Sequence, residues 1–134
     1  MNTFSLEIVT PDGAVFSGMV QSLLTRTDDG DIEILARHTD YLATVSTGRT
    51  RIILEDGSKK FASSSGGFLY VNGGAVRLVL TTFEFAENID KKRAEAAKAR
   101  AEDLISKAKS DRELDIAKAK LYRALNRINV SSYK

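Results

Sequence analysis

The chain has 134 residues, of which 43% are hydrophobic and 28% are charged, as in soluble globular domains. It contains no cysteine and one histidine, His38, which excludes disulfides, thiol nucleophiles and metal sites built on paired histidines. The net charge of +2 is divided unevenly, because residues 1–86 hold 7 basic and 10 acidic side chains whereas residues 87–134 hold 13 and 8.

Glycine and proline divide the chain into two parts. All nine glycines and the single proline occur at or before Gly74, so the remaining residues contain neither. Glycine supplies the backbone angles of tight turns, and both residue types interrupt helices. We therefore expect two domains, with short strands and turns in residues 1–86 and helices in residues 87–134.

The first part has the pattern of antiparallel β-structure. Phe4, Leu6 and Ile8 alternate with polar residues, which is the period of a half-buried strand. Asp56-Gly57 and Asn72-Gly73 each separate two apolar runs, a strong signal for a β-hairpin. Many short strands at this spacing indicate an antiparallel sandwich or barrel. Further strands or apolar runs are expected at residues 14–16, 20–27, 32–35, 43–46, 51–54, 61–62, 68–71 and 75–80.

The second part predicts two helices with one interruption. Asn88 is a candidate N-cap for a helix from Ile89 to about Lys109. Ser110 and Glu113 have the spacing of a capping box, which begins a second helix. The apolar stripe of the first helix is mostly alanine, so this helix buries little surface and the hairpin could detach from its neighbours at low cost. The fold class is thus α+β, an N-terminal antiparallel β-sandwich followed by a C-terminal two-helix antiparallel hairpin.

No catalytic residue set is visible in this sequence. The glycine motifs that bind dinucleotides and phosphates are absent. Asp28, Asp29, Asp31 and Glu33 resemble a calcium loop, but Ile34 stands where that loop needs glycine. No apolar run approaches the roughly 18 residues of a membrane-spanning helix. We expect a protein that is not an enzyme, with an acidic surface loop and no segment inserted into a membrane.

Four arginines of the helical part have a spacing that could create a binding site. Arg93 and Arg100 share one helix face, as do Arg123 and Arg127. A hairpin folded at residue 110 would bring the four together at its open end, near Asp90. Their repulsion could be relieved by a polyphosphate, because guanidinium groups bind phosphate oxygens in a bidentate way. The alternative is a solvated basic face, and spacing alone favours that alternative.

Five short motifs occur in a characteristic order along the chain. They are Val9-Thr10-Pro11-Asp12-Gly13, Phe16-Ser17-Gly18, Gly30-Asp31-Ile32-Glu33-Ile34-Leu35 with His38, Ser65-Gly66-Gly67-Phe68-Leu69-Tyr70-Val71, and Ile89-Asp90-Lys91-Lys92-Arg93-Ala94. In this order and spacing the chain resembles the epsilon subunits of bacterial F-type ATP synthases over its full length. The resemblance implies the same sandwich and hairpin that the patterns indicate.

The resemblance also implies a function and partners. Such a subunit is a non-catalytic part of the central stalk, bound to gamma and resting on the c-ring at the cytoplasmic face of the bacterial cell membrane. Its hairpin either folds against the sandwich or extends into the catalytic head, where basic residues meet an acidic segment of beta and ATP hydrolysis is inhibited. By resemblance, Asp28, Asp29 and Asp31 would lie near the c-ring and His38 near gamma.

Some members of this family bind ATP on the folded hairpin. Their motif is matched by Ile89, Asp90, Arg93 and Ala94. No cofactor is required, and ATP, alone or with Mg²⁺, would be a regulatory ligand that stabilises the folded form. By resemblance, Glu84 and Asp90 would contact the adenine and ribose, and the arginines would contact the phosphates. The full predicted set is Glu84, Ile89, Asp90, Arg93, Arg100, Arg123 and Arg127.

The chain differs from the family pattern at two places, and two other functions are possible for it. The family commonly has Pro-Gly where this chain has Ala36-Arg37, and glycine where it has Glu33. One rival is a purely structural coupling subunit whose hairpin does not regulate. The other is a nucleic-acid-binding module, which is disfavoured because the basic tail is interspersed with acids and has only Tyr122 and Tyr133 for stacking. The isolated subunit could also dimerise.

Overall fold

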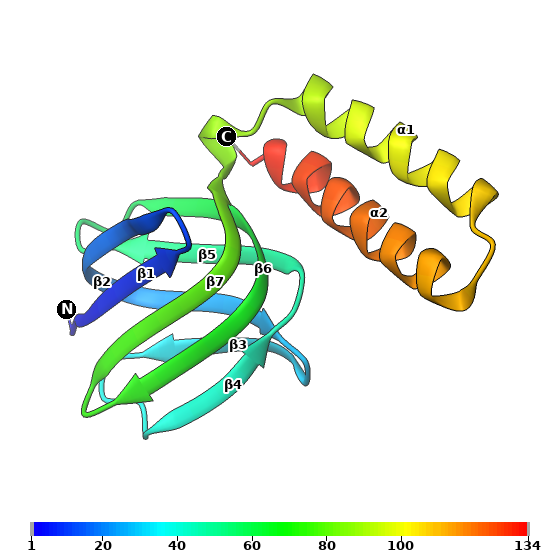
Figure 1. Ribbon diagram of the computed structural model, residues 1–134. Helices are drawn as coiled ribbons and strands as arrows, with labels where there is room; N and C mark the ends of the chain where they lie inside the picture. Colours follow the sequence, from blue (N-terminus) through cyan, green and yellow to red (C-terminus); the bar gives the residue numbers. More distant parts are fainter. Residues whose placement is uncertain (1, 134) are drawn as a thin grey trace. The chain divides into compact units, whose positions relative to one another are not determined.

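The computed structural model describes residues 2–133 (Figure 1). Contacts divide the chain after Phe85 into a sandwich unit and a helical unit. The sequence pattern predicts this boundary one residue later, after residue 86. The expected α+β class is confirmed, with a sheet-rich N-terminal part and two C-terminal helices. The strands are β1 (Phe4–Thr10), β2 (Gly13–Thr27), β3 (Gly30–Leu35), β4 (Tyr41–Val45), β5 (Gly48–Leu54), β6 (Lys59–Asn72) and β7 (Ala75–Phe85).

The pairing of the strands wraps the sheet around one core. β2 is antiparallel to β1, β3 and β5, and β6 is antiparallel to β4, β5 and β7. β1 pairs with β7 in parallel, with Leu6 opposite Val76, so the first and last strands are neighbours. This parallel pair joins segments about 70 residues apart, and no hairpin signal could have predicted it.

Two strands are longer than the sequence predicts. Residues 14–16 and 20–27 belong to one strand, β2, because Ser17, Gly18 and Met19 between them pair with β1. Likewise β6 continues through Gly66, whose φ is +66°, because the register with β7 is the same before it, at Ser65 and Thr82, and after it, at Gly67 and Leu80. Pairing with a neighbouring strand can thus keep a strand continuous across a glycine. Expecting breaks at these points was therefore wrong.

The core of the sandwich unit is apolar, except for three buried hydroxyl groups that are hydrogen-bonded to one another. The side chains of Leu6, Ile8, Leu23, Ile34, Ile52, Leu69 and Leu78 are fully buried. Beside them the hydroxyl of Thr50 lies 2.9 Å from that of Thr25 and 2.7 Å from that of Ser64, all three residues being buried. These bonds satisfy three hydroxyls on β2, β5 and β6 that would otherwise be costly to bury.

The Asp56-Gly57 turn joins β5 to β6, as the sequence predicts. The hydroxyl and the backbone N–H of Ser58 both donate to the Asp56 carboxylate, at 2.6 and 2.9 Å. These bonds favour the charged form and lower the pKa of that carboxyl below its ordinary value.

The helical unit consists of a short 3₁₀ helix, η1 (Ala86–Asn88), followed by α1 (Lys91–Lys107) and α2 (Asp111–Ser131). The N-cap of α1 is Asp90, not Asn88, because Asn88 ends η1. Ser110 caps α2 as expected: its hydroxyl accepts from the Glu113 N–H at 3.1 Å. The Glu113 carboxylate reaches back to the N–H of Lys109 at 2.8 Å, one residue before the usual position.

The two helices lie side by side and antiparallel (Figure 1), and the buried residues of the seam between them are alanines. Ala94 and Ala101 of α1 and Ala117 and Ala124 of α2 are buried, and each pair is seven residues apart. This common spacing lets both pairs meet in a single antiparallel register. No helix within residues 2–133 is long and apolar enough to cross a membrane.

Candidate functional site

The predicted nucleotide site begins where η1 passes into α1. The Asp90 carboxylate accepts a hydrogen bond of 3.1 Å from the N–H of Arg93 and so caps α1. Ile89 is buried, and its N–H donates to the Ala86 carbonyl at 3.2 Å. η1 itself packs against α2. Ile89 and Asp90 therefore hold the start of α1 in place, a structural role that sequence matching did not reveal.

The arginines lie on one side of the hairpin. Arg93, Arg100 and Arg123 each stand one residue before a buried alanine of the seam, and Arg127 stands three residues after Ala124. Successive residues are about 100° apart around a helix. In two antiparallel helices that face each other, these offsets point all four residues to the same side of the seam. Arg93 and Arg100 are exposed, whereas Arg123 and Arg127 are half-buried.

The seventh residue of the predicted set lies in the other unit. Glu84 is near the end of β7, half-buried and opposite Ser63 of β6. The predicted nucleotide-binding residues therefore come from both units, with one carboxylate on the sandwich and the basic groups on the hairpin.

The acidic loop between β2 and β3 is held by its own hydrogen bonds. The Asp28 carboxylate accepts from the Ser46 hydroxyl at 2.5 Å, and the Asp31 carboxylate pairs with Arg26 at 3.1 Å. Asp29 is exposed, and its N–H donates to the Thr27 hydroxyl at 3.2 Å. In the described chain, 2–133, no group of three or more acidic or histidine side chains could hold a metal ion.

Glu33 and His38 also have defined surroundings. The Glu33 carboxylate accepts from the buried Ser22 hydroxyl at 2.6 Å and pairs with Arg51 at 2.5 Å, which ties β3 to β2 and β5. The Glu33 side chain therefore has a partner on each of the two strands. His38 is half-buried, with Nδ1 2.7 Å from the Thr39 carbonyl oxygen and its ring edge-to-face with Tyr41.

The structure adds an apolar outer face that the sequence analysis missed. Phe68 lies opposite Val79, and Tyr70 lies opposite Leu42, across the neighbouring strands β4, β6 and β7. Their exposed fractions are 64% for Leu42, 53% for Phe68, 45% for Tyr70 and 43% for Val79. A contiguous exposed apolar face is typical of a protein interface. The signal was the unbroken apolar run Phe68–Val71, since a strand with one solvated face would alternate.

Comparison with known proteins accounts for both units. Residues 3–86 match the family model for the beta-sandwich domain of the ATP synthase Delta/Epsilon chain, and residues 87–132 match the model for its long alpha-helix domain. The chain belongs to the ATP synthase delta/epsilon chain family. This confirms the resemblance seen in the sequence.

Several bacterial epsilon chains are similar over nearly their whole length. The chain is 40% identical over 131 residues to the ATP synthase epsilon chain of Bacillus velezensis, covering 98% of both. It is 38% identical over 128 residues to that of Clostridium novyi, covering 96% of this chain and 97% of the relative. With that of Bacillus subtilis it shares 37% identity over 131 residues.

Solved structures show the same fold at low identity. A chain of the Euglena gracilis mitochondrial ATP synthase OSCP/F1/c-ring superposes with a TM-score of 0.82 at 21% identity, covering 98% of this chain and 82% of that one. A chain of the Tetrahymena thermophila mitochondrial ATP synthase central stalk and c-ring gives 0.62 at 13% identity, covering 95% of both. The family's fold is thus retained at these identities.

Proposed function

We propose that the chain is a non-catalytic central-stalk subunit of an F-type ATP synthase that couples the c-ring to the gamma subunit. The observation that carries this proposal is the match of both units to epsilon chains over nearly their whole length. The partners are gamma, the c-ring and beta, and nucleic acid is not among them. The subunit would be peripheral, at the cytoplasmic face of a bacterial cell membrane.

The apolar outer face of Leu42, Phe68, Tyr70 and Val79 is the proposed contact with gamma. These side chains are exposed in the isolated subunit, and covering them with another subunit removes apolar surface from water. The Glu7–Arg77 ion pair of 2.8 Å borders this face, since Arg77 lies opposite Tyr70. The loop carrying His38 leads directly into β4, and the acidic loop at 28–31 would meet the c-ring.

The helical unit is the proposed regulatory element. Its seam is built on alanines, which bury little area, and at about 25 cal/mol per Å² such a seam holds weakly. The helices can therefore separate at low cost, and residues 87–134 carry a net charge of +5 from 13 basic and 8 acidic side chains. Extended, this basic segment would face an acidic segment of beta and inhibit ATP hydrolysis.

ATP is the proposed ligand that stabilises the folded hairpin. The four arginines on one side of the hairpin supply guanidinium groups for a polyphosphate. A ligand that binds only the folded form shifts the equilibrium away from the extended one. Asp90 would serve mainly by positioning Arg93, because its carboxylate caps α1. Glu84 would contribute from the sandwich, and Mg²⁺ could accompany the nucleotide.

Removal of the hairpin tests whether it regulates. Deletion of residues 88–134 in the assembled enzyme is expected to raise the ATP hydrolysis rate, because the inhibitory segment is gone. A wild-type hydrolysis rate in the truncated enzyme would instead support the purely structural coupling subunit.

Calorimetric titration of the isolated chain with ATP, with and without Mg²⁺, tests the ligand. One-to-one binding is expected, weakened about tenfold or more in Arg93→Ala, which corresponds to about 1.4 kcal/mol. Arg112→Ala removes an exposed arginine from the first turn of α2 and is the matched control for charge. Absence of binding at millimolar ATP would remove nucleotide sensing and leave the stalk proposal intact.

A further inference from the structure

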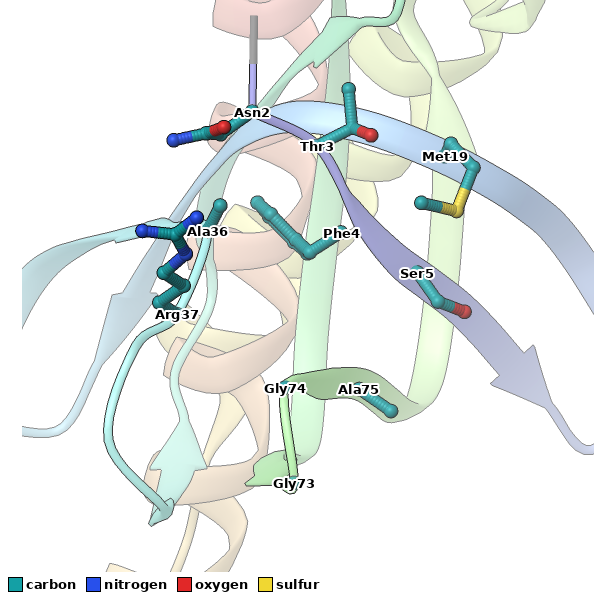
Figure 2. A pocket seen from close by; sticks show the side chains of 10 residues that line it. All are labelled: Asn2, Thr3, Phe4, Ser5, Met19, Ala36, Arg37, Gly73, Gly74 and Ala75. Carbon is teal, nitrogen blue, oxygen red and sulfur yellow. The ribbon is translucent and has the colours of Figure 1, made fainter.

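A hollow of about 440 Å³ lies at one end of the sandwich unit (Figure 2). The start of β1, the loop between β3 and β4 and the turn between β6 and β7 surround it. Figure 2 shows the Phe4 ring in the middle of the hollow, with Arg37 and Asn2 on one side and Met19 and Ser5 on the other. None of the established or proposed roles above uses this hollow.

Arg37 holds an uncommon backbone conformation at the rim. Its φ of +64° lies in the left-handed region, where no other non-glycine residue of the described chain is found. This region is unfavourable for a residue with a Cβ and persists only where the surroundings enforce it. Asp40 of the same loop accepts a 3.0 Å hydrogen bond from the N–H of Gly73, which joins this loop to the turn between β6 and β7. Glycine adopts this conformation without strain, so the arginine side chain at this position is the unexplained feature.

The groups around the hollow suit a carboxylate. The lining contains one guanidinium group, the hydroxyls of Thr3 and Ser5 and the amide of Asn2, and none of the lining residues is acidic. No side chain among residues 2–133 forms an ion pair with Arg37, which is exposed. The exposed side chain of Met19 would contact the carbon atoms of an entering side chain, whereas Phe4 is only 4% exposed and belongs to the core. A guanidinium group binds a carboxylate through two parallel hydrogen bonds.

We propose that this hollow receives an aspartate or glutamate side chain of the gamma subunit, bound by Arg37. The inference rests on the proposed function and deepens it. Gamma is the partner because the loop carrying Arg37 leads into β4, whose Leu42 belongs to the apolar outer face. The loop that lines the hollow thus leads directly into a strand of the proposed gamma interface.

Substitution of Arg37 is expected to have opposite effects on stability and on binding. Arg37→Gly relieves the left-handed conformation, so its melting temperature is expected to rise above that of the wild type. The same change removes the guanidinium group, so its affinity for the epsilon-depleted enzyme is expected to fall about tenfold and to depend less on salt. Arg37→Asn also tolerates this backbone and loses the charge, and should bind as weakly. Lys59→Gln, an exposed charge change on β6, is the control.

The outcomes separate the two proposals. A wild-type chain that fails to bind the depleted enzyme would overturn the stalk function and this inference together. Wild-type binding that is unchanged in both Arg37 variants would overturn only the carboxylate site. Arginine-dependent binding to vesicles of anionic phospholipid, with unchanged affinity for the enzyme, would also overturn it and assign Arg37 to a membrane headgroup.

Discussion

The carboxylate of Asp90 accepts a 3.1 Å hydrogen bond from the backbone N–H of Arg93, which joins the two polar residues of the predicted nucleotide motif. An N-cap carboxylate satisfies one of the unpaired N–H groups of the first helical turn and interacts favourably with the helix dipole. A motif read as a ligand site therefore also determines where α1 begins.

Asp90→Ala is expected to lower the stability of the hairpin as well as its affinity for ATP. Loss of an N-cap costs about 1 kcal/mol. Asp90→Asn keeps an oxygen that can accept from the Arg93 N–H, so it should retain most of the stability. Urea unfolding followed by far-UV circular dichroism measures the difference. If Asp90→Ala were as stable as Asp90→Asn, the cap would have no energetic role.

Phe68→Ser and Leu42→Ser are expected to weaken the binding of gamma with little effect on folding. Both side chains are more than half exposed, so their loss removes apolar contact area only in the complex. Together they should reduce affinity about tenfold or more, since central apolar anchors dominate binding energy. Surface plasmon resonance with gamma measures this. Val15→Ser, an exposed apolar residue of β2, is the control, and equal weakening by it would contradict a local interface.

Thr50→Val is expected to destabilise the sandwich more than Thr25→Val. The Thr50 hydroxyl bridges those of Thr25 and Ser64, so its removal leaves two buried hydroxyls without this partner. Each buried polar group left unsatisfied costs about 1–3 kcal/mol. Thr25→Val breaks one bond and keeps the Thr50–Ser64 pair. Equilibrium unfolding in urea should rank wild type above Thr25→Val and Thr25→Val above Thr50→Val; the reverse order of the two variants would contradict the bridge.

Gly67→Ala is expected to disrupt the pairing of β6 with β7. A Cβ at this position would overlap the carbonyl oxygen of Val79 on the neighbouring strand. The backbone must therefore move, which should cost about 3 kcal/mol or more, the upper end for overpacking. Gly18→Ala is the matched control, because its Cβ would lie 3.6 Å from the Phe16 ring, an ordinary contact. Similar thermal stability of the two variants would contradict this close approach.

The capping box at Ser110 and the hairpin at Asp56-Gly57 were predictable because their determinants lie within four residues of one another. The long strands β2 and β6 were not, because glycine in a strand signals either an end or a bulge. At Gly18 and Gly66 pairing with neighbouring strands continues the strand. The expected N-cap at Asn88 was wrong, because Asn88 is the last residue of η1 and Asp90 caps α1.

By itself the sequence determined the α+β class, the division into sandwich and hairpin, the alanine seam and the family. Turn residues, helical periodicity and the order of motifs are local features, so they can be recognised without the structure. Only the tertiary structure decided the parallel pairing of β1 with β7, the buried Thr25–Thr50–Ser64 chain and the left-handed Arg37 beside its hollow. It also brought Leu42, Phe68, Tyr70 and Val79 onto one outer face. These features depend on contacts between residues far apart in the chain, and such contacts form only when the strands pair in the folded sheet.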